Sequence, residues 1–181
     1  MKRAMNLLTG IFVISFLVFI CIYCNTGKML ALTITLGTCA YHFLMRLCVG
    51  YVINFCYHNK MNYQRKWFQS KQWESKLYKY LKVKIWKEKM PTYAVGTFSF
   101  ELHSMEEVLG AMCQAEVVHE IIVILSFVPL LFAISFGAFG VFLITSILAA
   151  GFDMMFVVMQ RYNRPRIVKL LDKKGKRYGN I

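Results

Sequence analysis

Acidic residues are scarce in this chain of 181 residues, which has nine Asp and Glu against 22 Lys and Arg. Charged residues make up only 17% of it, whereas a soluble domain carries about a quarter. Three prolines and six cysteines are too few for a proline-rich disordered chain or a small disulfide-rich domain. Hydrophobic residues reach 57%. This composition excludes an ordinary cytosolic enzyme and indicates an integral membrane protein.

Several catalytic patterns are also missing. The chain has no glycine-rich phosphate-binding loop and no nucleophile elbow, and His103 is followed five residues later by Val108 rather than by an aspartate. Four histidines are too few for a di-iron centre built from histidine boxes. Cys21 and Cys24 have redox spacing but lie in an apolar run, so packing explains them better. A net charge of +13 does not indicate a nucleic-acid-binding protein here, because contact with an anionic membrane surface accounts for the charge.

Long apolar runs predict the fold. Each of four runs is about long enough to cross the ~30 Å hydrocarbon core of a bilayer as a helix. A tight turn at residues 25–28 separates the first two, and Gly137 and Gly140 mark the turn between the last two. We therefore predict an all-α integral membrane protein whose four transmembrane helices form two hairpins, at residues 7–24, 29–50, 114–135 and 138–160.

The basic residues test this number of spans. Lys2 and Arg3 lie at the start, ten Lys and Arg lie in residues 60–89, and eight more lie in residues 161–177. With four spans all three basic segments fall on one side of the membrane, as the positive-inside rule requires. Three or five spans would place one of them outside. We therefore expect both termini and the central segment to be cytoplasmic.

Two further helices are expected outside the spans. In residues 60–90, aromatic and aliphatic residues recur among lysines at roughly helical spacing, which is typical of a basic amphipathic helix lying in the headgroup layer. Ser104, followed by two acidic residues in the first turn, predicts a helix start that leads into the third span. The basic tail at 161–181 contains Pro165, which suits the first turn of a separate short helix.

Ionisable residues inside spans are costly and mark functional sites. This chain has six in or beside its spans: His42, Arg46, Glu116, His119, Glu120 and Asp153. They come from three helices and have similar depths, so we expect them to face one another. One interpretation is structural pairing of Arg46 with Asp153 or Glu116. The other is catalysis, with His119 as a general base held by its neighbours Glu116 and Glu120. Metal binding by His42, Glu116, His119 and Glu120 is a third possibility, although we predict no metal.

A polar string follows the fourth span. It contains Arg161, Tyr162, Asn163, Arg164 and Arg166. Three arginines with directional hydrogen-bonding neighbours favour binding of an anionic substrate such as a phosphate group. A plain membrane anchor that contacts lipid headgroups is the alternative. We expect this string to bind substrate together with Arg46, His42 and Asp153.

Three stretches resemble a known family of small bacterial membrane proteins, the glycosyl-4,4'-diaponeurosporenoate acyltransferases. They are residues 83–91 (VKIWKEKMP), 115–119 (AEVVH) and 160–166 (QRYNRPR). The resemblance covers roughly residues 73–171 and adds Trp86 and Lys87 to the substrate-binding residues. It implies transfer of a fatty acyl group to a sugar hydroxyl of a glycolipid-like acceptor. Gln114 and Glu120 depart from the family pattern, which has Arg before the second stretch and often Trp after it.

These expectations combine into one leading function. It is a membrane O-acyltransferase of the bacterial inner membrane, with acyl-CoA or an acyl carrier protein as donor and no further cofactor. Its partners would be membrane lipids and a lipid-linked acceptor, without nucleic acid, and the oligomeric state stays open. The alternatives are a small lipid-modifying transferase or reductase with a nucleotide-type cofactor, and a non-enzymatic lipid-binding protein.

Overall fold

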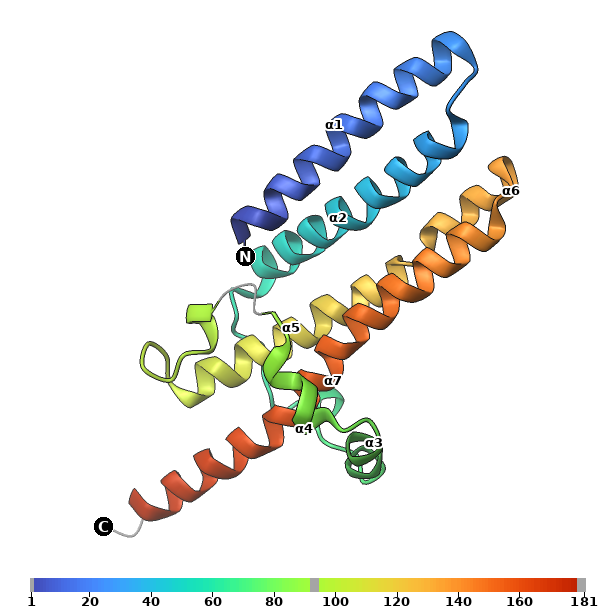
Figure 1. Cartoon of the computed structure of the whole chain (residues 1–181). Coiled ribbons are helices and arrows are strands. Elements are labelled where there is room, and N and C mark those ends of the chain that lie inside the picture. The colour runs from blue at the N-terminus through green and yellow to red at the C-terminus, as the bar shows by residue number, and fades with distance from the viewer. Residues whose placement is uncertain (1, 92–94, 179–181) are drawn as a thin grey trace.

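The computed structural model describes residues 2–91 and 95–178, and within them every regular element is helical (Figure 1). Four helical stretches are long and apolar enough to cross a membrane. The predicted all-α membrane fold with four spans is thereby confirmed. Elements in chain order are α1 (Lys2–Thr26), α2 (Leu30–Tyr57), η1 (Lys66–Phe68), α3 (Glu74–Tyr80), α4 (Val83–Trp86), η2 (Lys87–Lys89), η3 (Val95–Phe98), α5 (Met105–Leu125), η4 (Val128–Phe132), α6 (Ala133–Phe136) and α7 (Phe139–Tyr178).

Helices α1 and α2 form the first hairpin. Gly27 turns the chain with a φ of 67°, a conformation that glycine adopts without steric cost. The two helices approach closely because Gly37 faces the ring of Phe16, where an added Cβ would lie 2.8 Å from a ring carbon. The rings of Phe12 and Phe43 stack nearby at 5.1 Å. Many of the remaining apolar side chains of α1 are exposed, as expected for a helix surrounded by lipid.

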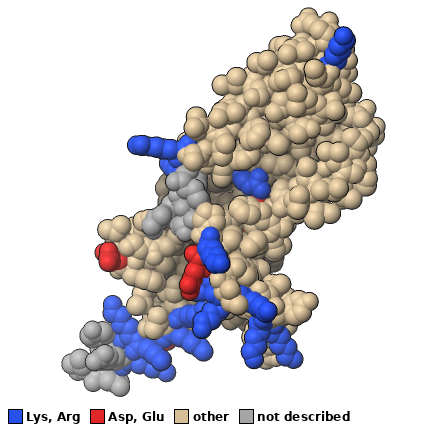
Figure 2. Space-filling model, in the orientation of Figure 1, with Lys and Arg blue, Asp and Glu red and all other residues tan. Residues whose placement is uncertain are grey.

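Helices α5 and α7 form the second hairpin. The predicted helix start is confirmed, because Ser104 and Glu107 form a reciprocal capping box. The predicted turn is also present, with Gly137 at a φ of 67°. Both hairpin turns lie at the same end of the molecule, and the helices α3 and α4 lie at the other (Figure 1). Basic side chains gather at this second end and over the last part of α7 (Figure 2).

Two expected helices differ from the structure. The segment 60–90 is not one amphipathic helix but a series of short ones, because Lys82 has a left-handed backbone (φ 50°) that separates α3 from α4. The tail does not start a new helix at Pro165. Instead α7 runs for 40 residues through that proline, or about 60 Å, which is twice the thickness of the hydrocarbon core. Its second half therefore extends out of the membrane.

Polar contacts connect the two hairpins and the central segment. The hydroxyl of Tyr41 on α2 donates to the carbonyl of Leu125 on α5 at 2.8 Å. In the middle of α5, the Gln114 side chain accepts from the backbone N–H of Asn59 at 2.7 Å and donates to the side-chain oxygens of Asn54 and Asn59. Gly110 lies one turn before Gln114, and an added Cβ there would come within 2.7 Å of the Asn59 carbonyl. Close approach and a buried amide thus fix the end of α2 against α5.

Candidate functional site

Asp153 on α7 is the centre of a polar cluster between three spans. Its side chain is buried, and one carboxylate oxygen accepts a hydrogen bond from the guanidinium of Arg46 on α2. The other oxygen lies 2.9 Å from Nδ1 of His119 on α5. The side chains of Arg46 and His119 retain 15% and 22% exposure, so the cluster is accessible at its edge. A buried carboxylate needs such partners, because an isolated charge in a membrane interior is strongly unfavourable.

The orientation of His119 is fixed from two directions. Its ring stacks on Phe156, one turn from Asp153 on α7, with centroids 4.5 Å apart and planes within 7° of parallel. Its Nδ1 is directed to Asp153. A carboxylate at Nδ1 favours the tautomer in which that nitrogen carries the proton, which leaves Nε2 able to accept one. The pair can therefore serve as a general base.

A second cluster surrounds Glu116, which is completely buried one turn before His119 on α5. One carboxylate oxygen accepts from Arg161 at 2.6 Å, and the other accepts from Arg164. Arg164 is only 2% exposed, and its remaining nitrogens donate to the Phe68 carbonyl at 2.6 and 3.1 Å. All three of its nitrogens are therefore bonded within the protein.

Glu74 on α3 completes this second cluster. It is 2% exposed and accepts two hydrogen bonds from Arg161, at 2.6 and 3.0 Å. The Tyr78 hydroxyl donates to its other oxygen at 2.8 Å. Burial, and then this hydrogen bond, raises the pKa of Tyr78 far above its ordinary value, so the hydroxyl stays protonated and continues to donate. Arg161 thus connects α7 to α5 and to the central segment.

The rest of the polar string contacts the central segment. Asn163 accepts from Lys87 at 3.0 Å, and the Lys87 ammonium lies 5.3 Å from the ring centroid of Tyr162. Arg166 lies over the same ring at 3.8 Å. Trp86 donates to the Leu81 carbonyl at 2.9 Å. The three stretches that carry the family resemblance therefore meet in space, with residues 83–91 against residues 160–166.

Several expected arrangements need correction. His119 contacts Asp153 rather than Glu116, because two arginines already occupy both oxygens of Glu116. The pairing of Arg46 with Asp153 is confirmed. The arginines do not present one anion-binding surface, since Arg161 and Arg164 are directed inward to buried carboxylates. Glu120 accepts from the indole of Trp67 at 3.0 Å and not from His119.

The structure does not bring together the residues of the alternative metal site. Among the described residues, no three His, Cys, Asp or Glu side chains lie close enough to hold an ion. His42 is 7% exposed, and both of its ring nitrogens are buried without a hydrogen-bond partner in the described part of the chain. It lies one turn from Arg46 on α2, so it belongs to the wall of the Asp153 cluster.

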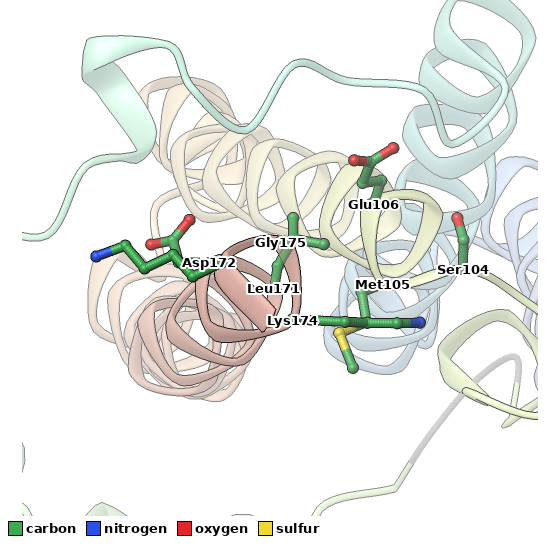
Figure 3. A pocket seen from close by; sticks show the side chains of 8 residues that line it. Ser104, Met105, Glu106, Leu171, Asp172, Lys174 and Gly175 are labelled. Carbon is green, nitrogen blue, oxygen red and sulfur yellow. The ribbon is translucent and has the colours of Figure 1, made fainter. Parts of the chain in front are cut away.

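Two pockets open at the basic end of the molecule. The larger, about 710 Å³, lies between the start of α5 and the end of α7, where Ser104, Met105 and Glu106 face Leu171, Asp172 and Lys174 (Figure 3). It begins fourteen residues before His119, or about 21 Å along α5, so it is remote from His119. The smaller, about 380 Å³, includes Glu120 and Arg161 in its lining.

Together these features define a four-span helical membrane protein with two clusters of buried ion pairs. A family model described as glycosyl-4,4'-diaponeurosporenoate acyltransferase matches residues 64–173, more than half of the chain. The chain belongs to this family. No curated protein and no solved structure matches it. The matched region contains His119, Asp153, Glu116 and the polar string, whereas Arg46 and His42 lie outside it.

Proposed function

We propose that this protein is a membrane O-acyltransferase, which moves a fatty acyl group from a cytoplasmic thioester to a hydroxyl of a lipid-linked glycosyl acceptor. The observation that carries the proposal is the contact between His119 and Asp153 inside the bundle. Membership of a family that is named for an acyltransferase supports the reaction type. That name also supports a glycosyl carotenoid as acceptor.

The proposed reaction uses His119 twice. Nε2 of His119 takes the proton of the acceptor hydroxyl as the oxygen attacks the thioester carbonyl. When the C–S bond breaks, the same nitrogen returns this proton to the leaving thiolate, so the products are an ester and a free thiol. Asp153 holds the required tautomer and stabilises the imidazolium that forms in between, and Arg46 donates to the other carboxylate oxygen of Asp153.

The Glu116 cluster has a positioning role in this proposal. Its ion pairs join α5 and α7 to the central segment within one turn of His119. We therefore no longer assign the binding of donor phosphates to Arg161 and Arg164, which bind the carboxylates of this cluster instead. The same ion pairs leave Arg161 and Arg164 unavailable to the phosphates of a nucleotide-type cofactor.

The proposed placement in the cell follows from the charge distribution. The basic end of the molecule faces the cytoplasm, with both termini, in the inner membrane of a bacterium. An acyl-CoA or an acyl carrier protein then reaches the site from the cytoplasm. The hydrophobic parts of both substrates can stay in the lipid around the exposed apolar faces of the spans.

The test is acyl transfer in proteoliposomes that contain glycosyl-4,4'-diaponeurosporenoate and a labelled acyl-CoA. Wild-type protein should form the acylated product, and His119→Gln should lower the rate at least ~100-fold, the smaller effect expected for a lost general base. His103→Gln is the matched control, because His103 is exposed just before the start of α5 and its ring lies 3.8 Å from the Glu107 carboxylate. Full turnover by His119→Gln would refute the proposed mechanism.

A further inference from the structure

The smaller pocket lies between the central segment and the second hairpin. Its lining comes from η1, the following loop, α3, α5 and α7, and consists of Lys66, Trp67, Lys71, Trp73, Glu74, Glu120 and Arg161. Its volume of about 380 Å³ can enclose part of a small ligand. The buried pair of Glu74 and Arg161 ties the pocket to the Glu116 cluster, so its position relative to α5 is fixed.

Basic and aromatic side chains alternate along one wall of this pocket. Lys66 and Lys71 are exposed, as are Trp67 and Trp73 with 64% and 57% of their surfaces. The Lys71 ammonium lies 6.0 Å from the Trp73 ring centroid. Glu74 and Glu116 already neutralise Arg161, so the two lysines are the cations that are available to an anionic ligand. This combination suits a phosphate group attached to an organic chain.

The pocket also extends to the residue that directly follows the proposed catalytic His119. Glu120 lines it and directly follows His119 on α5, so their Cα atoms are about 3.8 Å apart. The Glu120 carboxylate is held in place by the indole of Trp67. A carboxylate repels a phosphate but accepts hydrogen bonds from amide N–H groups. The charges therefore orient a ligand with its phosphate at the lysines and its amide portion toward His119.

We infer that this pocket binds the acyl donor as a phosphorylated pantetheine thioester, the group that CoA and acyl carrier proteins share. Lys66 and Lys71 bind the phosphate, and Glu120 accepts from a pantetheine amide, which directs the thioester to His119. This inference rests on the proposed function. It assigns the donor phosphate to Lys66 and Lys71 and not to the polar string that follows the fourth span, because Arg161 and Arg164 of that string form buried ion pairs.

The experiment compares two donors, octanoyl-CoA and octanoyl-pantetheine, which lacks phosphate. The variant Lys66→Gln/Lys71→Gln should raise KM for octanoyl-CoA about tenfold or more, the effect of losing one or two hydrogen bonds between charged groups. Its kcat should stay within about twofold, and its KM for octanoyl-pantetheine should not change. The control Lys76→Gln/Lys79→Gln removes the same charge from exposed positions of α3 outside the pocket and should leave all values unchanged.

Calorimetric titration of the purified protein with CoA separates this inference from the proposed function. Loss of CoA binding in Lys66→Gln/Lys71→Gln supports the pocket even if the wild type transfers no acyl group, a result that would refute only the function. Unchanged CoA binding and unchanged KM overturn the pocket and leave the function standing. Native mass spectrometry provides a third arm. Loss of a retained anionic lipid with unchanged CoA binding would identify a headgroup site and also overturn the inference.

Discussion

Asp153 contacts His119 through one carboxylate oxygen and Arg46 through the other, so a single buried side chain joins three membrane spans. Such a pair of contacts can stabilise the bundle, prepare His119 for proton transfer, or do both. The two roles are separable. Stability depends on charge pairing between α2 and α7, whereas catalysis also depends on which nitrogen of His119 carries the proton.

The variant Asp153→Asn tests the catalytic role. Its amide nitrogen can donate to Nδ1 and thereby favour the tautomer in which Nε2 is protonated and cannot act as a base. We expect the rate of acyl transfer to fall ~10²–10⁴-fold. The double variant Arg46→Met/Asp153→Asn also removes the unpaired arginine and should recover thermal stability without recovering activity. If the double variant regained the wild-type rate, the role of Asp153 would be structural only.

Removing Glu116 alone should destabilise the protein more than replacing Glu116 and Arg164 together. Glu116→Ala leaves Arg161 and Arg164 with one partner fewer in a buried site, which costs about 3–5 kcal/mol in comparable cases. The measurement is the unfolding temperature in detergent. The double variant Glu116→Leu/Arg164→Met replaces the ion pair with apolar side chains of similar volume and should be the more stable of the two. The opposite order would show that the charges themselves hold α5 against α7.

Much of the fold could be predicted because its determinants are local. Apolar runs set the spans, the capping box at Ser104 set the start of α5, and Gly137 set the turn before α7. The continuation of α7 through Pro165 could not be predicted in this way. A proline favours a helix start by local rules, whereas here Asn163 and Arg164, directly before Pro165, contact the central segment from within a continuous helix.

The residues of the candidate site could be predicted from the sequence, but not all of the contacts between them. The cost of charges in a membrane identified His119, Asp153 and Arg46, because that argument needs only their depth. Which carboxylate meets which cation depends on the rotation of each helix about its axis. Glu74 escaped prediction because it lies in a lysine-rich segment where acidic residues usually pair at the surface. The one sequence signal was Tyr78, four residues later on the same helix face.

Gly110→Ala should destabilise the junction of α2 and α5. An alanine Cβ would lie 2.7 Å from the Asn59 carbonyl oxygen, a backbone atom that the contacts of Gln114 hold in place. We expect a loss of about 1–3 kcal/mol, the range for overpacking, measured as a lower unfolding temperature. Gly151→Ala is the matched control, because nothing lies within 4 Å of a Cβ added there. That control should be neutral or stabilising, by up to ~1 kcal/mol, since alanine favours helix.

The orientation of the two hairpins gives the last prediction. Their turns lie at one end of the molecule, and the basic side chains gather at the other (Figures 1 and 2). The positive-inside rule then places the turns outside and the central segment in the cytoplasm. Reporter fusions after Lys28 and after Gly137 should therefore give external activity, and a fusion after Lys89 should give cytoplasmic activity. A cytoplasmic result at Gly137 with an external result at Lys28 would show that α5 and α7 do not cross the membrane as a hairpin, which contradicts the four-span arrangement. External activity at Lys89 would instead show that the whole protein has the opposite orientation in the membrane. The proposed donor site would then lie on the side that lacks cytoplasmic thioesters.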